Sequence, residues 1–157
     1  MIQSVKPAPT DETDGLPMPK RIWAVISVGF ALCMSVLDVN IINIVLPTLS
    51  HDFGTSPAVT TWIINGYQLA IVVSLLSFSA LGEIIGYRKV YLSGIGLFCI
   101  TSLICALSDS FWTLTIARIF QGFSASAITS VNTAQLRYIY PKSQLGRGMG
   151  INAMVVA

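Results

Sequence analysis

Residues 22–49 read IWAVISVGFALCMSVLDVNIINIVLPTL, an apolar stretch with a single charged side chain, Asp38, far from either end. The stretch is long enough to cross a bilayer as a helix, which takes about 20 residues. A charge at bilayer depth costs about 2.5–3.5 kcal/mol on insertion scales, so chains that keep one usually have a use for it. Asp38 therefore indicates that ions, protons or polar solutes pass through this protein.

The composition of the whole chain also places it in lipid. Hydrophobic residues make up 54% of the 157 residues and charged residues only 10%, and the mean hydropathy is +0.73. An aqueous fold of this length cannot cover so much apolar surface, so we expect an all-α integral membrane protein. The three cysteines lie in apolar segments without CxxC or Cys/His spacing, which favours packing over a disulfide or a metal site. They are Cys33, Cys99 and Cys105.

The hydropathy pattern divides the chain into a tail and a series of spans. Residues 1–21 form a polar, proline-rich segment with Asp11, Glu12 and Asp14 close together, and we expect a disordered cytoplasmic tail. Residues 22–157 are expected to form a partial transmembrane bundle, because the fifth apolar segment stops at Ala157 without a polar flank. The pattern thus predicts four complete transmembrane helices and the start of a fifth, in a fragment. The spans are about 22–49, 58–84, 90–107, 111–137 and 148–157.

Apart from Arg118, inside the fourth span, the basic residues are confined to alternate connections. They are Lys6, Lys20 and Arg21 before the first span, Arg88 and Lys89 between the second and third, and Arg137, Lys142 and Arg147 between the fourth and fifth. The other two loops have no Lys or Arg, so the positive-inside rule places the N-terminus in the cytoplasm. Trp23, Trp62 and Trp112 fall at span ends, as an aromatic belt requires. We expect a multi-pass protein of the cell inner (cytoplasmic) membrane.

Three of the four complete spans carry polar side chains that lipid would not tolerate. These are Asp38, Asn40 and Asn43 in the first span, Asn65, Tyr67 and Gln68 in the second, and Arg118, Gln121, Asn132 and Gln135 in the fourth. The third span has almost none, so we expect the other three to line a polar site and the third to be peripheral. For the neutral side chains, hydrogen bonds that hold helices together are an equal alternative.

Asp38 and Arg118 are expected at similar depths. Asp38 lies about 16 Å below the outer end of its span, and Arg118 about 10 Å below the outer end of the fourth. If Asp38 faced a dry cavity alone, burial would favour its protonated form and make it a proton carrier. If Arg118 paired with it, the pair would be a fixed link between helices, and an antiporter could alternate between these states. Gln121 lies one helical turn from Arg118, on the same face.

The hairpin from Leu81 to Lys89, LGEIIGYRK, joins a carboxylate, a glycine turn and two cations. One interpretation is a conformational latch, with Glu83 opposed to Arg88 or Lys89 across the turn at Gly86. The other is a loop whose cations only anchor the chain at the membrane surface.

Motifs for hydrolysis and for ATP use are missing from the sequence. It has no GxxxxGK[ST] and no HExxH, and Gly122 to Ser126, GFSAS, lacks the last Gly of GxSxG. We therefore expect a protein that is not an enzyme and that needs no cofactor.

Several of these segments resemble motifs of one transporter family, over the chain from about Trp23 onward. LDVNIINIVLP, residues 37–47, resembles the first-helix motif LDxTIVNVALP of drug:proton antiporters with fourteen helices in the major facilitator superfamily, with Asn40 and Val45 replacing Thr and Ala. Trp62, Tyr67 and Leu69 resemble the second-helix pattern W-x4-Y-x-L. The resemblance implies a major-facilitator-type helix bundle.

Two further motifs extend the resemblance. The hairpin resembles the loop signature GxLaDrxGrk, which Leu81, Gly86 and Arg88 match, with Glu83 at the position of its Asp. Residues 114–126 resemble the fourth-helix motif LxxxRxxQGxgaa, which they match at Leu114, Arg118, Gln121 and Gly122.

The resemblance implies roles for these residues. Arg118 is expected to act in proton coupling, Asp38 in coupling or cation recognition, and the hairpin in conformational control. Gln121, Asn43 and Tyr67 are expected beside them as proton-coupling or substrate-binding residues. Transporters of this kind use inverted three-helix repeats, with sites near the bilayer midplane.

We therefore expect the N-terminal part of a proton-coupled secondary transporter that exports small lipophilic or cationic compounds, a multidrug efflux antiporter. Its partners would be that substrate, protons, the bilayer and the remaining helices of the transporter, with no nucleic acid. One alternative is a carrier for another solute class, such as a sugar or an organic acid. Another is a non-transporting membrane protein that binds helices through small-residue faces such as Gly82-x3-Gly86.

Overall fold

The first span is a single long helix in this computed structural model, which describes residues 15–156. Helix α1 runs over Met18–Asp52. Residues 1–14 of the predicted tail lie outside the described residues, but the predicted end of the tail at residue 21 is too late. The backbone N–H of Leu16 donates to Ile139 O over 3.2 Å, and Arg21 Nε donates to Leu16 O over 3.1 Å. The first bond ties the residues before α1 to a distant segment, and the second connects them to the first turn of the helix. Helix α1 therefore begins at Met18, four residues before the predicted span.

The second span consists of two helices in line. Helix α2, Pro57–Thr60, and helix α3, Trp62–Ile85, are separated only by Thr61, whose backbone is itself helical (φ −58°, ψ −23°). Ser56 caps the start, since its side chain accepts a hydrogen bond from the N–H of Val59, and Pro57 occupies the first turn. Residues 58–84, where the second span is predicted, are thus helical in the structure, and the span itself stays a prediction.

The third span follows after one residue. Helix α4, Tyr87–Ala106, begins directly after Gly86, which has φ +100° and ψ +131°. Side chains with a Cβ rarely adopt this conformation, so the predicted glycine turn is confirmed, and it reverses the chain in the least possible length.

The fourth span is the most buried helix of the described chain. Helix α5, Phe111–Ile139, is capped by Ser110 and is followed by a short 3₁₀ turn, η1, Lys142–Gln144, and by helix α6, Leu145–Val156. The buried side chains of α5 come from most of its length, and they include Arg118, Gln121 and Asn132. Helix α6 begins slightly earlier than the predicted residue 148.

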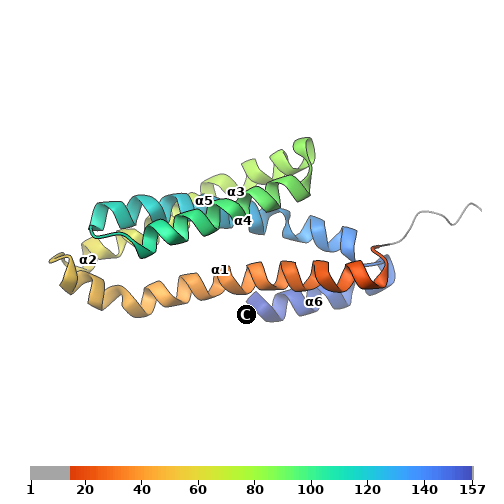
Figure 1. Cartoon of the computed structure of the whole chain (residues 1–157), viewed down its shortest axis with the longest axis horizontal. Coiled ribbons are helices and arrows are strands. Elements are labelled where there is room, and N and C mark those ends of the chain that lie inside the picture. Colours follow the sequence, from red (N-terminus) through yellow and green to blue (C-terminus); the bar gives the residue numbers. More distant parts are fainter. Residues whose placement is uncertain (1–14, 157) are drawn as a thin grey trace, which may run out of the picture.

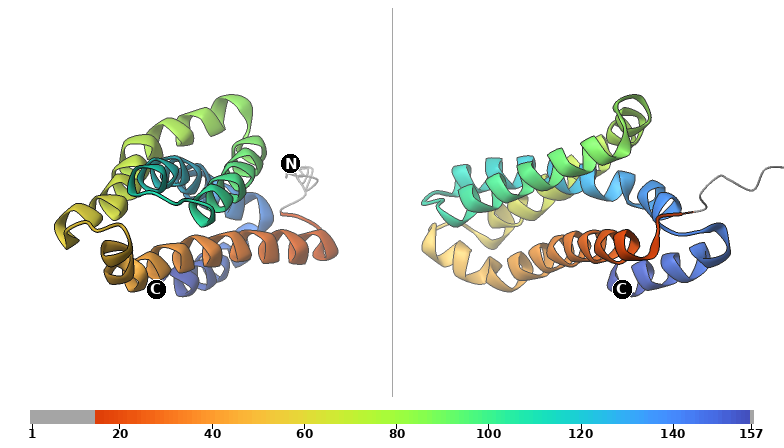
Figure 2. Two further views of the ribbon diagram at one scale, coloured as in Figure 1. Left: turned by 60° about the vertical axis from the view of Figure 1, so that its left-hand side comes forward. Right: turned by 45° about the vertical axis from the view of Figure 1, so that its right-hand side comes forward.

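Helices α3, α4 and α5 pack together, and α1 runs along this group (Figure 1). Helix α6 lies beside the N-terminal half of α1. The turned views keep α6 on the side of α1 away from α4 (Figure 2). The main apolar core joins α1, α3, α4 and α5 through residues such as Val28, Tyr67, Val90 and Val131.

Three segments of the described chain are long and apolar enough to cross a membrane: Met18–Asp52, Pro57–Ile85 and Tyr87–Ala106. Helix α5 has 29 residues, enough to span. Its polar side chains lower its hydropathy, and many of them are covered by the other helices. A span for α5 therefore stays a prediction that depends on its neighbours, as expected for a helix in the interior of a membrane bundle.

Candidate functional site

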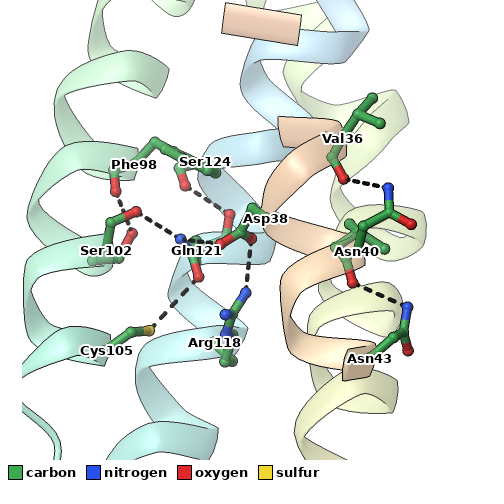
Figure 3. Close-up of polar contacts among 12 residues, drawn as sticks. Val36, Asp38, Asn40, Asn43, Phe98, Ser102, Cys105, Arg118, Gln121 and Ser124 are labelled. Carbon is green, nitrogen blue, oxygen red and sulfur yellow. Dashed lines mark hydrogen bonds and ion pairs between the residues drawn. The ribbon is translucent and has the colours of Figure 1, made fainter. Parts of the chain in front are cut away.

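The predicted partners Asp38 and Arg118 form an ion pair inside the helix bundle (Figure 3). Arg118 Nη1 of α5 donates to Asp38 Oδ2 of α1 over 2.7 Å. The two side chains are only 9% and 16% exposed for Arg118 and Asp38, respectively. Of the two sequence-based alternatives, the direct pair is the one formed in this conformation, and the two side chains lie at the same level of the bundle.

Gln121 completes the coordination of the carboxylate. Its Nε2 donates to Asp38 Oδ1 over 3.2 Å, so each oxygen of Asp38 accepts a bond from α5. Gln121 lies one turn from Arg118 and is 1% exposed. The predicted placement of these two side chains on one helix face is confirmed. Both donors favour the charged form of the carboxylate, which burial by itself disfavours.

Helix α4 also contributes to the site, so its predicted peripheral role is wrong in this respect. Gln121 Nε2 donates to Ser102 Oγ over 2.7 Å, and Cys105 Sγ lies 3.6 Å from Gln121 Oε1. The sequence offered no reason to place either residue in the site, because Ser and Cys in a span usually form their hydrogen bonds with the backbone of their own helix. Thr101, next to Ser102, does so by donating to Leu97 O. No signal in the sequence separates the two cases.

The asparagines of the first span do not join the cluster. Asn40 Nδ2 donates to Val36 O over 2.9 Å, and Asn43 Nδ2 donates to Val39 O over 3.0 Å, both within α1. Their side chains lie on an exposed face that points away from Arg118 (Figure 3). The structure therefore leaves Asn43 outside the group formed by Asp38, Arg118 and Gln121.

Tyr67 lies at the closest crossing of α3 and α5. It is 5% exposed and belongs to the main core. At this crossing Gly122 of α5 faces the carbonyl of Tyr67 and the Cβ of Ala70, with no room for a side chain. Gly66 makes a looser contact from the other side, since a Cβ added there would lie 3.1 Å from the side-chain atom Ile119 Cγ1. Close backbone contact thus holds α5 on α3 and fixes where Arg118 and Gln121 point.

The four residues of the predicted latch are exposed at the basic end, the end of the bundle that carries Lys20, Arg21, Arg88, Lys89, Arg137 and Arg147. Ion pairs among the described residues join only Asp38 to Arg118 and His51 to Asp52. Glu83 therefore does not pair with Arg88 or Lys89 in this conformation. Instead, Glu83, Gly86 and Arg88 line a cavity of about 800 Å³ together with Lys20 of α1.

A second polar contact links α5 to α6. Asn132 Nδ2 donates to Asn152 Oδ1 over 3.1 Å. Two side-chain atoms nearby on α5 are buried without a partner among the described residues, Asn132 Oδ1 and Gln135 Nε2. Arg118 Nε is in the same state, so the ion pair does not use the full donor capacity of its guanidinium.

The cysteines are free. Cys33 and Cys99 are exposed on this chain, whereas Cys105 is half-buried beside Gln121. Within this chain only Cys105 is packed against another helix, where it also makes a polar contact, and a packing role for Cys33 and Cys99 stays a prediction.

Comparison with known proteins agrees with this architecture. The family model of the Major Facilitator Superfamily matches residues 28–157. The chain is 51% identical over 149 residues to the uncharacterized transporter YebQ of Escherichia coli, which covers 95% of the chain and 33% of that protein. It is 32% identical to the tetracenomycin C resistance and export protein of Streptomyces glaucescens, over 96% of the chain and 28% of that protein.

A third relative is named for another solute. The riboflavin transporter RibZ of Clostridioides difficile is 32% identical over 87% of the chain and 30% of that protein. The chain thus spans about a third of the length of the relatives it matches. The family match covers the ion pair, the hairpin and the α3–α5 crossing, and the chain belongs to the Major Facilitator Superfamily of membrane transporters.

Proposed function

We propose that this chain is the N-terminal part of a proton-coupled exporter of small lipophilic or cationic compounds. The observation that carries the proposal is the buried cluster of Asp38, Arg118 and Gln121 between α1 and α5. Buried ionisable groups inside a transporter bundle are the usual elements of a proton relay. No chemical step on a substrate is needed for this role.

Protonation of Asp38 would change how α1 is held. Among the described residues, both side-chain hydrogen bonds between α1 and α5 end on the Asp38 carboxylate. A protonated Asp38 keeps no charge for Arg118, so the strongest polar link between these helices weakens. A ligand that binds one arrangement of α1 better than the other can then shift the equilibrium, which couples proton uptake to a change of conformation.

An apolar groove supports the lipophilic part of the proposed substrate range. It has a volume of about 670 Å³ and lies between α3 and α5, where Trp62, Trp112 and Phe123 contribute aromatic rings. Its α5 wall includes Thr115 and Ile119, on the turns next to Arg118. One relative is named as a tetracenomycin C resistance and export protein, which favours transport out of the cell.

Reconstitution tests the proposal. A full-length transporter that carries this sequence would be placed in proteoliposomes loaded with ethidium, a lipophilic cation. We expect an imposed pH gradient to drive ethidium across the membrane and a protonophore to stop it. Movement of ethidium that ignores the pH gradient would contradict proton coupling.

A carrier for another solute class is the second candidate, because one relative is named a riboflavin transporter. The same proteoliposomes distinguish the two candidate functions. Proton-driven uptake of riboflavin, with no movement of ethidium or other lipophilic cations, would favour this candidate over the exporter.

The proposed orientation places the N-terminus in the cytoplasm of the cell, with the basic end inside. We expect a cysteine at His51, whose side chain is 92% exposed, to react with an impermeant thiol reagent on intact cells. A cysteine at Ser143, in η1, should react only after the membrane is opened. The background would lack Cys33, Cys99 and Cys105, and the reverse labelling pattern would overturn the orientation.

The proposed latch predicts a kinetic effect at Glu83. Because Glu83 is exposed and unpaired with Arg88 or Lys89 in this conformation, Glu83→Gln should leave membrane abundance near normal. Its charge would act only in another state of the cycle, so the transport rate should change by several-fold. Asp109→Asn, an exposed carboxylate at the opposite end, serves as the control. A collapse of abundance, or an unchanged rate, would contradict the latch.

A further inference from the structure

The hydroxyl of Ser102 holds the side chain on which Asp38 depends. Gln121 is 1% exposed, so its amide must make its hydrogen bonds within the protein. One N–H of Nε2 donates to Asp38 Oδ1 over 3.2 Å, and the other donates to Ser102 Oγ over 2.7 Å. The bond to α4 is the shorter of the two (Figure 3). The amide thus has no free N–H, and its two hydrogen-bond acceptors lie on α1 and on α4.

The opposite end of the amide is also occupied. Cys105 Sγ lies 3.6 Å from Gln121 Oε1, and a thiol beside a carbonyl oxygen acts as a weak donor. Ser102 and Cys105 lie three residues apart on α4, on one helix face. Together they favour the orientation in which nitrogen, not oxygen, faces the carboxylate.

We propose that Ser102 is a positioning residue for Asp38, which acts through Gln121 to hold an N–H against the ionised carboxylate. This inference rests on the proposed function of Asp38 in proton coupling. A hydrogen bond to a charged group is worth more than one to a neutral group. Ser102 therefore influences the pH at which Asp38 takes up its proton, although it touches neither the proton nor the substrate.

A hydroxyl suits this position because it both donates and accepts. When Asp38 is protonated, its O–H needs an acceptor. If the Gln121 side-chain amide flips, so that Oε1 and Nε2 exchange places, Oε1 faces Asp38 and accepts the hydrogen bond from its O–H. The Ser102 hydroxyl then donates to Oε1 instead of accepting from Nε2. An alanine at 102 supports neither orientation, whereas a threonine supports both.

Among residues 15–156, few other ionisable groups face this cluster. Tyr67 of α3 and Cys105 of α4 are close enough to feel the charges of Asp38 and Arg118, and Arg118 itself comes from α5. None of them is changed in the variants below, so a shift in pH dependence reports on the link from Ser102 through Gln121.

The pH dependence of ethidium transport tests the inference. In a full-length transporter that carries this sequence, Ser102→Ala should move the pH of half-maximal transport upward by about one unit, since the ionised carboxylate loses part of its donor support. Ser102→Thr should keep the wild-type profile. Ser93→Ala is the matched control, because the Ser93 hydroxyl on the same helix donates only to Val90 O. An unchanged profile in Ser102→Ala with normal transport would overturn the inference.

A second measurement does not depend on transport. The rate at which N-ethylmaleimide alkylates Cys105 would be measured by mass spectrometry on detergent-purified protein, with Cys99 of the same helix as internal reference. Release of Gln121 frees the thiol, so Ser102→Ala should raise the Cys105 rate several-fold, and Ser102→Thr should not. If wild-type protein shows no proton-driven transport but this difference is present, the proposed function fails while the contact is real. Equal Cys105 rates in all variants would refute the positioning role.

Discussion

Replacing Asp38 with Asn is expected to abolish proton-driven transport and to lower the amount of folded transporter. The transport loss follows from the removal of the group proposed to change protonation. The loss of abundance follows from the ion pair, because the variant leaves Arg118 as a buried cation, 9% exposed, without a counter-charge. Breaking a buried pair from one side costs about 3–5 kcal/mol. Membrane abundance and ethidium transport would be measured on the same preparations.

A double variant separates the two effects. Asp38→Asn combined with Arg118→Gln removes both charges, so no charge is left buried without a partner. Abundance should therefore return toward wild type while proton-driven transport stays absent. Asp52→Asn is the control, since Asp52 is 63% exposed and pairs only with His51. Normal transport by the double variant would exclude both residues from proton coupling. If the double variant were less abundant than Asp38→Asn, the unpaired Arg118 cation would not be the cause of the low abundance of Asp38→Asn.

The sequence predicted the elements of this fold well because the signals are strong in a membrane chain. Apolar length predicted the long helices, Gly86 predicted the turn, and the positions of Asp38 and Arg118 along their helices predicted that the two side chains meet. Each of these depends on local pattern or on distance along a helix axis, which the sequence fixes to within a turn.

Rotation of each helix about its axis could not be predicted in the same way. Asn43 and Asp38 lie on the same span, yet one bonds to its own backbone and the other reaches α5. Ser102 and Thr101 are neighbours with similar chemistry, and only Ser102 contacts Gln121. Which side of a helix faces its neighbours is decided by packing among all of them, so a hydroxyl in the third span carried no sign of its role.

The start of α1 was missed for a related reason. Residues 15–21 look like a polar tail, but Arg21 Nη1 donates to Gln144 Oε1 and Arg21 Nε donates to Leu16 O. Arg21 and Gln144 lie 123 residues apart in the sequence, and their contact depends on η1, between α5 and α6, being in place. Contacts of this kind leave no local pattern.

The crossing of α3 and α5 carries the other large expected effect. Gly122→Ala would add a Cβ that collides with the backbone carbonyl of Tyr67 and lies 2.8 Å from the Cβ of Ala70. Neither obstacle is a flexible side chain, so the helices would have to separate, and overpacking of this kind costs about 1–3 kcal/mol and occasionally more. Separation would also shift Gln121, the residue just before Gly122 on α5, away from Asp38. We therefore expect a large loss of folded protein and of transport in the molecules that remain.

Gly96→Ala is the matched control for this change. Gly96 lies inside α4, and an added Cβ there meets nothing within 4 Å. Alanine has a higher helix propensity than glycine, by about 1 kcal/mol, so this variant should be as stable as wild type or slightly more stable. Thermal unfolding in detergent, followed by the fraction of monodisperse protein, would compare the two. If Gly122→Ala melts at the same temperature as Gly96→Ala, the close approach of α3 and α5 does not hold the site in place, because a tight backbone contact cannot accept a methyl group without a measurable shift.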